Sequence, residues 1–190
     1  GGVGDKISLP LCPLVASFGA AVPQLSGRGL GTFGGTLDKM ESVSGFNISL
    51  SNEQMINQLK NVGVFITAAG VGLAPADRKM YSFRDVIGAV ECIPLIASSI
   101  MSKKIAEGTQ SLVLDVKAGR GAFMKDFAKA KQLAETMVEI GNNAGVKTVA
   151  LITQMETPLG NAVGNALEVS ESIEVLNGKG PSDVIEITLA

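Results

Sequence analysis

A glycine-rich stretch over residues 26–41 has the composition of an anion-binding loop. Five glycines fall within nine residues of it, an apolar run precedes them and a helix-compatible run follows. Glycine lets backbone N–H groups approach an anion without a Cβ clash, and a helix N-terminus adds partial positive charge. The hydroxyls of Ser26 and Thr36 bracket the loop, and Arg28 offers a counter-charge. These residue types predict a phosphate cradle.

The spacing of the glycines leaves a second interpretation open. No Gly-Lys-Ser/Thr closes the loop and the glycine spacing differs from the dinucleotide fingerprint, so neither the Walker nor the Rossmann pattern applies. Glycine clusters of this kind also form tight turns without a ligand. From the residues alone, the stretch is either a phosphate cradle or a structural turn.

A second group of chemistry-bearing residues lies on two expected helices in the middle of the chain. Ser99 and Lys103 are four residues apart, so a helix puts their hydroxyl and ammonium on one face, where they can read a flat polar ligand. Lys103 also fits a role as a complement to the helix dipole. Arg84 either pairs with Asp85 at the surface or directs a cation at a carbonyl or anion. The residues alone leave these alternatives open.

Composition narrows the chemistry that the chain can perform. It has 190 residues, 46% hydrophobic and 18% charged, which fits a soluble α/β domain with a substantial core. The net charge of −2 gives no electrostatic reason to bind nucleic acid or an acidic membrane, and no apolar run reaches transmembrane length. The absence of histidine excludes His-based catalysis and metal binding from within these residues. Cys12 and Cys92 are expected to be buried, reduced core thiols, which favours a cytoplasmic protein.

Apolar runs alternate with helical patterns along the chain, which predicts a parallel sheet covered by helices on both faces. Ligands in such folds bind beyond the carboxyl ends of the strands, where the glycine loops after Leu25 and Val116 lie. Met101, Met124 and Met137 are expected to fill the core. Because of its two prolines, a helix within residues 7–18 is expected to be short or to start late. Strands are expected over 20–25, 64–69, 111–116 and 148–153, and further helices over 36–42, 51–62, 74–85, 94–105, 127–140, 162–176 and 183–189.

Seven motifs resemble, in the same order, those of the thymidine and pyrimidine-nucleoside phosphorylase family, and they cover essentially the whole chain. The resemblance implies the central α/β domain of that family, with a largely parallel (mixed) sheet flanked by helices. It also implies that the family's helical dimerisation domain and C-terminal domain lie outside residues 1–190. The motifs are residues 1–5, 26–41, 74–77, 84–86, 96–104, 114–117 and 164–169.

The resemblance implies phosphorolysis. Phosphate would attack C1′ of a pyrimidine 2′-deoxynucleoside, thymidine or deoxyuridine, and release the free base and 2-deoxyribose 1-phosphate. No cofactor is implied, because phosphate is a co-substrate. The protein would contribute placement and electrostatic stabilisation of the charge that develops on the departing base. The family is homodimeric.

The resemblance also assigns roles to particular residues. By position, Arg84, Ser99 and Lys103 match the family residues that hold the base, and we expect them to be catalytic. This agrees with their chemistry, since two cations beside a departing pyrimidine anion would stabilise it. The phosphate ligands implied in the same way are Ser8, Ser26 and Thr36, with the backbone amides of Gln24 and Leu25.

The sequence departs from the family pattern in two places near the phosphate. The family has a Lys-His-Ser-Thr stretch directly before the opening glycines, and residues 1–190 do not contain it, so we expect these residues alone to be inactive or nearly so. The signature loop usually reads Gly-His-Thr-Gly-Gly, whereas this chain has Thr32 and then Phe33, a bulky ring beside the phosphate.

Some family members bind potassium at a site that this chain would not reproduce. The threonine of that site is replaced by Lys6, whose ammonium is expected to take the place of the cation and pair with Glu168; otherwise Glu168 fits a surface acid. No metal is therefore expected. The matching positions are Gly4, Lys6, Leu159, Ala162 and Glu168.

Two other functions stay open at the level of sequence. An anthranilate-type phosphoribosyltransferase shares the fold and a glycine-rich opening motif, and would act on a diphosphorylated ribose with magnesium; the match at Arg84, Ser99 and Lys103 argues against it. A non-catalytic remnant that binds nucleoside or supports a partner is favoured by the absence of histidine and by Phe33.

Overall fold

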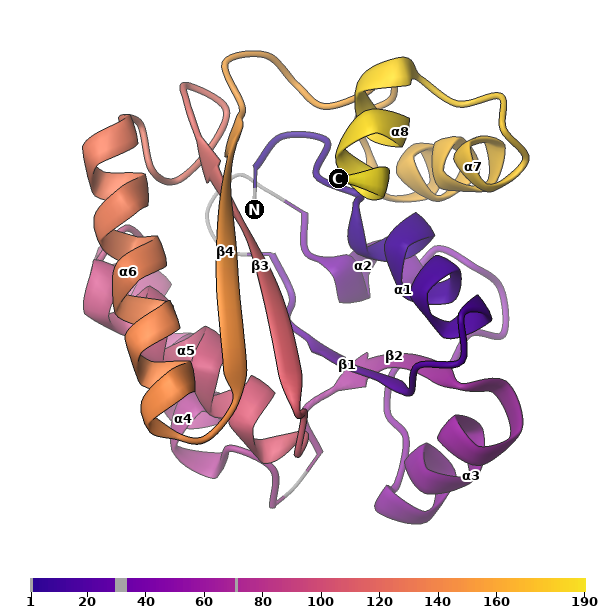
Figure 1. Ribbon diagram of the computed structural model, residues 1–190, viewed down its shortest axis with the longest axis horizontal. Helices are drawn as coiled ribbons and strands as arrows, with labels where there is room; N and C mark the ends of the chain where they lie inside the picture. Colours follow the sequence, from indigo (N-terminus) through magenta and orange to yellow (C-terminus); the bar gives the residue numbers. More distant parts are fainter. Residues whose placement is uncertain (1, 30–33, 71) are drawn as a thin grey trace. The chain divides into compact units, whose positions relative to one another are not determined.

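The computed structural model divides the chain into two compact units, each with one pair of parallel strands (Figure 1). It describes residues 2–29, 34–70 and 72–190, with backbone alone at positions 82 and 85. Unit 1 contains residue 2 and residues 72–157, and unit 2 contains residues 3–70 and 158–190. The expected parallel α/β architecture is confirmed, with the strands arranged as one pair in each unit.

Unit 1 is built on two long strands. β3 (Ser111–Ala118) and β4 (Lys147–Gln154) pair in parallel along their whole length. The helix α6 (Phe127–Asn143) lies between them in sequence and packs against both. In turn α5 (Ile93–Ala106) packs on α6, and α4 (Pro75–Val86) packs on α5 (Figure 1).

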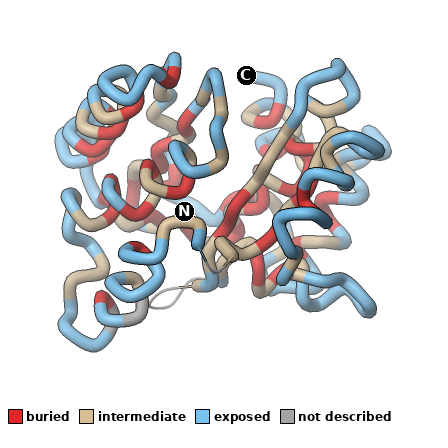
Figure 2. Tube along the Cα trace, turned by 90° about the horizontal axis from the view of Figure 1, so that it is seen from below, coloured by how far each residue is buried: buried red, intermediate tan, exposed pale blue. Residues whose placement is uncertain are grey.

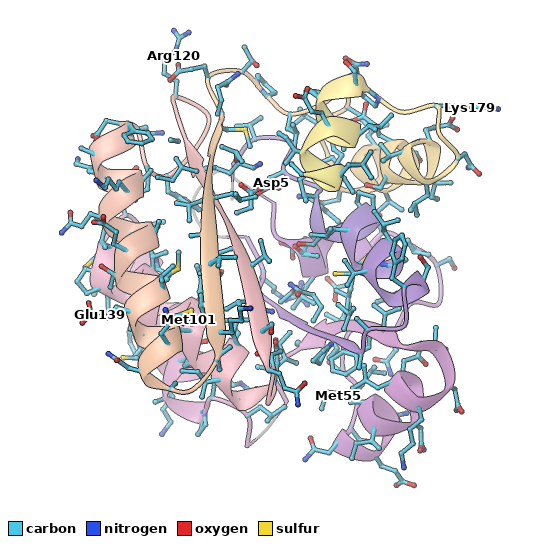
Figure 3. The ribbon with its side chains drawn as sticks, viewed as in Figure 1. Asp5, Met55, Met101, Arg120, Glu139 and Lys179 are labelled. Carbon is cyan, nitrogen blue, oxygen red and sulfur yellow. The ribbon has the colours of Figure 1, made fainter. Side chains whose placement is uncertain are left out.

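The core of unit 1 lies between α5, α6 and the strands, and Figure 2 colours buried positions red. Met101, labelled in Figure 3, belongs to this core together with Met124 and Met137, as expected. The opposite face of the strand pair is different: Val113, Val149 and Leu151 are exposed. The expectation of helices on both faces is therefore wrong for the described part of unit 1, in which α6 covers one side. The core residues are Ile96, Ala97, Met101, Leu114, Val116, Met124, Ala130, Leu133, Ala134 and Met137.

Unit 2 is built on two short strands, β1 (Val22–Ser26) and β2 (Val64–Ala68), which also pair in parallel. The helices α1 (Ser8–Ser17) and α3 (Asn52–Val62) each pack on both strands. The short α2 (Thr36–Glu41) follows the glycine loop and packs on β2.

Two further helices complete unit 2. The helix α7 (Asn165–Leu176) packs against α1 and α2, and α8 (Ser182–Leu189) packs against α1. The C-terminal end of the chain thereby supports the segments on both sides of the glycine loop. Among the residues that the structure describes, no helix is both long and apolar enough to cross a bilayer.

Local sequence signals explain the boundaries of α3. The Ser51 hydroxyl accepts a hydrogen bond from the amide of Gln54 (3.2 Å), and the Gln54 side chain accepts one from the amide of Ser51 (2.8 Å). Gly63 ends the helix with a φ of 85°, a left-handed conformation that glycine adopts without strain. The expected helix over 51–62 is thus confirmed together with its caps.

The helix α1 corrects an expectation, because it begins at Ser8, ahead of both prolines. Pro10 lies in the first turn, where backbone N–H groups have no acceptor within the helix, so the lack of an N–H at proline costs no hydrogen bond. Pro13 lies inside the helix and removes one backbone hydrogen bond, yet the helix continues to Ser17. The buried residues of this helix are Leu9, Pro10 and Cys12. Packing of this face therefore outweighs the local preference of proline against a helix.

Two other expectations are corrected. The helix expected over 162–176 begins only at Asn165, because Gly164 has a φ of 134°, which is incompatible with a helix. In the described part of the chain neither cysteine forms a disulfide; Cys12 is buried as expected, but Cys92 is exposed. Cys92 lies directly before α5, in an extended backbone conformation.

Candidate functional site

The loop between β1 and α2 folds back on itself around Gly35. A Cβ added at Gly35 would lie 2.3 Å from the carbonyl carbon of Arg28 and 2.4 Å from the amide nitrogen of Gly29. Leu37, in the first turn of α2, donates its amide to the carbonyl of Gly27 (3.4 Å). The backbone of the loop therefore packs directly on the start of α2, and only glycine fits at position 35.

Asp38 closes this loop through its carboxylate. Its Oδ2 accepts hydrogen bonds from the amides of Gly29 (2.7 Å) and Gly35 (2.9 Å), and its Oδ1 accepts one from Arg28 (3.0 Å). Partial burial raises the pKa of Asp38, but these donors outweigh it and hold the pKa below its usual value. Arg28 also donates to both carboxylate oxygens of Glu41, at 2.6 and 2.8 Å. Arg28 therefore contacts both Asp38 and Glu41 of α2, and its expected role as a counter-charge to phosphate stays a prediction.

The expected phosphate ligands all belong to unit 2. Ser26 ends β1, and its Oγ accepts a hydrogen bond from the Gln24 side chain (3.3 Å). Ser8 and Thr36 are the first residues of α1 and α2, where backbone N–H groups lack helical acceptors. The Leu25 side chain is buried in the core, so only its backbone is available to an anion. Thr32 and Phe33, which depart from the family pattern, lie outside the described residues.

Two buried lysines of unit 2 pair with two buried glutamates on α7. Lys39 Nζ lies 2.8 Å from Glu168 Oε2, and Lys6 Nζ lies 2.5 Å from Glu171 Oε2. The expected pairing of Lys6 with Glu168 is therefore wrong, and so is the interpretation of Glu168 as a surface acid. Glu168 and Glu171 are three residues apart and share one face of α7, so tertiary packing decides which lysine each one meets.

Lys6 makes the other contacts expected of it. Its Nζ donates to the carbonyls of Leu159 (2.8 Å) and Ala162 (3.0 Å), two of the positions that match the family's potassium site. With the Glu171 carboxylate, these acceptors surround the ammonium, which is fully buried. The arrangement does not fit a potassium ion, because the lysine charge already occupies the place of the cation.

The three expected base-binding residues belong to unit 1, and two of them, Ser99 and Lys103, contact each other beside an acid. Lys103 Nζ donates to Ser99 Oγ (2.9 Å), as their spacing predicts, and to Asp77 Oδ2 (2.7 Å). Burial lowers the pKa of Lys103, and the nearby cations Lys104 and Arg84 add to this, whereas Asp77 opposes the shift. Asp77 is thus the group that favours the charged form of Lys103.

Arg84 is buried, which rules out the exposed surface pair with Asp85 considered from the sequence. The Asp85 side chain is outside the described part of the chain. The Arg84 guanidinium donates to the carbonyl of Val90 and, at 3.5 Å, to that of Ala89. Burial lowers the pKa of Arg84. Both cations lie near the Tyr81 ring: the Arg84 Cζ is 5.8 Å and the Lys103 Nζ 5.4 Å from its centre.

Sequence reasoning missed Asp77 and Tyr81. Both lie on α4 with Arg84, at spacings of four and three residues, so the three share one helix face. That spacing was the available signal, since Asp77 lies in a motif otherwise used only for the family resemblance. Of this face, Arg84 lines a cavity of about 310 Å³, whose other lining residues are Lys79, Met80, Phe83, Ile87 and Leu95.

Comparison with known proteins identifies the chain's family. Residues 1–190 match the family described as "Glycosyl transferase family, a/b domain". The chain is 63% identical to thymidine phosphorylase of Mycobacterium tuberculosis (strain CDC 1551 / Oshkosh), and 54% identical to pyrimidine-nucleoside phosphorylases of Staphylococcus haemolyticus and Geobacillus stearothermophilus. Each match covers all of this chain and 44% of the relative, so the chain spans less than half the length of these relatives. The chain belongs to the glycosyl transferase family through this α/β domain, and the relatives it is similar to are thymidine and pyrimidine-nucleoside phosphorylases.

Proposed function

We propose that the protein catalyses the reversible phosphorolysis of pyrimidine 2′-deoxynucleosides, with thymidine or deoxyuridine and inorganic phosphate as substrates. The names of its relatives support this reaction class. The observation that carries the proposal is the buried cluster of unit 1. There Lys103 contacts Ser99, and both Lys103 and Arg84 lie over the Tyr81 ring. The cluster concentrates two cations and a hydroxyl, which suits a flat base with carbonyl oxygens.

In this proposal, unit 1 stabilises the leaving group. Cleavage of the glycosidic bond leaves negative charge on the pyrimidine, spread over its ring nitrogen and carbonyl oxygens. Arg84 and Lys103 supply positive charge in a place where burial excludes water, so each interaction is stronger than it would be at the surface. The Ser99 hydroxyl orients the Lys103 ammonium and can contact the base itself.

The proposal gives unit 2 the task of holding phosphate. Ser8, Ser26 and Thr36 offer hydroxyls, and the starts of α1 and α2 offer amides that lack helical acceptors. The close packing of Gly35 on residues 27–29 supports this role, since it holds these backbone groups in place before any ligand arrives. A phosphate ion held in this way needs no metal, and we propose a reaction independent of added divalent cations.

The test is release of thymine from thymidine by the intact protein, followed with and without phosphate and with and without magnesium. We expect turnover that depends on phosphate and is indifferent to magnesium. Dependence on magnesium together with a diphosphorylated ribose would support the phosphoribosyltransferase alternative instead. Binding of phosphate and thymine without turnover would support the non-catalytic alternative. We also propose a homodimer, which light scattering of the intact protein would test.

A further inference from the structure

A buried ion pair joins α7 to α2 beside the residues proposed to bind phosphate. The Lys39 and Glu168 side chains are only 3% and 5% exposed. Lys39 lies one turn after Thr36 in α2, and its Nζ also donates to the backbone carbonyl of Asp5 (2.5 Å), three residues before Ser8. Asp5 is labelled in Figure 3. One ammonium therefore ties the segment that carries Thr36 to the segment that carries Ser8.

Glu168 also makes a hydrogen bond at the start of its own helix. Its Oε1 accepts a hydrogen bond from the amide of Gly164 (3.1 Å), the residue that precedes α7. The same end of α7 reaches the glycine loop, because a Cβ added at Gly34 would lie 2.7 Å from Oδ1 of Asn165. The first turn of α7 thus forms a fixed support behind the loop and α2.

The charge of Glu168 argues that its role is positional. A lysine beside an anion site would attract phosphate most strongly without a partner, and Glu168 cancels that charge. A carboxylate in this place repels phosphate, so any favourable effect of Glu168 on phosphate binding must come from the way it positions other groups. Removing one member of a buried pair leaves the other charge unpaired, and the remaining side chain then shifts toward water. For Lys39, such a shift would displace α2 and release the carbonyl of Asp5.

We propose that Glu168 is a positioning residue for phosphate binding, which through Lys39 holds α2 and residues 5–8 in the geometry that receives the anion. This inference rests on the proposed phosphate site of unit 2. It assigns Glu168 and Lys39 no contact with phosphate itself.

The test is Glu168→Gln, which keeps the shape of the side chain and removes its charge. Inorganic phosphate is titrated by calorimetry into the intact wild-type and variant proteins, well below their unfolding temperatures. We expect the variant to bind phosphate about tenfold more weakly, and its KM for phosphate to rise by about tenfold while its KM for thymidine stays within about twofold. The double variant Lys39→Met with Glu168→Gln should not lose more than either single change.

A matched control separates positioning from a general loss of stability. Glu107→Gln removes a carboxylate that is similarly buried and paired with Lys104, but in unit 1. It should lower the unfolding temperature and leave phosphate affinity unchanged. If Glu168→Gln does not fold, Lys39→Arg keeps the charge and alters the geometry, and it should weaken phosphate binding several-fold.

Unchanged or tighter phosphate binding in Glu168→Gln, or in Lys39→Arg where that variant replaces it, overturns the inference. Tighter binding would mean that the carboxylate only opposes the anion. Failure of the wild-type protein to bind phosphate is a distinct result: it refutes the proposed phosphate site, and the inference with it.

Discussion

Lys103 Nζ lies 2.7 Å from Asp77 Oδ2 inside a cluster whose burial lowers the pKa of the lysine. Asp77 is the carboxylate that works against this effect, because its negative charge stabilises the ammonium. Asp77 thus favours the charged form of Lys103. The acid therefore controls a charge that the proposed reaction needs.

The first prediction concerns Asp77→Asn. Loss of the carboxylate lets the pKa of Lys103 fall further, so the ammonium loses its proton at lower pH. We expect the alkaline limb of the plot of kcat/KM against pH to move to lower pH. Asp126→Asn is the matched control, since Asp126 caps α6 and asparagine caps helices equally well. Superimposable alkaline limbs for Asp77→Asn and wild type would contradict the assignment.

The second prediction concerns Gly35→Ala. The added methyl group would lie within 2.5 Å of three backbone atoms, so the loop must open. We expect phosphate affinity to fall by at least about tenfold and stability by about 1–3 kcal/mol. Gly70→Ala is the control in the same unit, because a Cβ there has nothing within 4 Å. The loop would not be the phosphate site if Gly35→Ala bound phosphate like the control.

The third prediction concerns how Asp38 contributes to the free energy of unfolding as pH falls. Asp38 has a lowered pKa, so its contribution is present above its unfolded pKa of about 3.9 and is lost as pH falls through the lower folded pKa. Asp38→Asn should therefore cost about 1–3 kcal/mol at neutral pH and progressively less on acidification. Urea unfolding at several pH values measures this, with the exposed Glu139→Gln as control. A cost that does not shrink in acid would contradict the role given to Asp38.

The fourth prediction concerns Lys6 as a built-in cation. Lys6→Met leaves Glu171 buried without its partner, which should cost about 3–5 kcal/mol, and adding Glu171→Gln should recover much of this. In Lys6→Ala the carbonyls of Leu159 and Ala162 are left around an open space, and potassium chloride should stabilise this variant more than choline chloride does. Equal stabilisation of wild type and variant by potassium would show that Lys6 does not replace an ion.

Much of the fold follows from local signals in the sequence. The caps of α3, the glycine before α2 and the apolar strand β3 each depend on residues in or next to the element they define. Ser99 and Lys103 were paired correctly for the same reason, because a spacing of four in a helix determines that contact.

Other features depend on contacts between segments that are distant in sequence, which the periodicity of the sequence does not predict. Lys6 meets Glu171 across 165 positions, and one helical turn separates Glu171 from Glu168, so the sequence could not decide between them. The start of α1 before its prolines depends on burial against other elements of unit 2. Asp77 was missed because a carboxylate near a helix start has many ordinary roles, and only packing of α4 on α5 brings it to Lys103.

The most direct measurement is phosphate-dependent release of thymine from thymidine by the intact protein, its Lys103→Ala variant and the control Lys104→Ala. Lys104 adjoins Lys103 but pairs with Glu107, so its loss leaves the cluster of Asp77 and Ser99 in place. The account predicts turnover that requires phosphate and falls by about 100-fold or more in Lys103→Ala, while Lys104→Ala stays within about threefold of wild type. Turnover that persists without phosphate, or that survives the loss of Lys103, would contradict it.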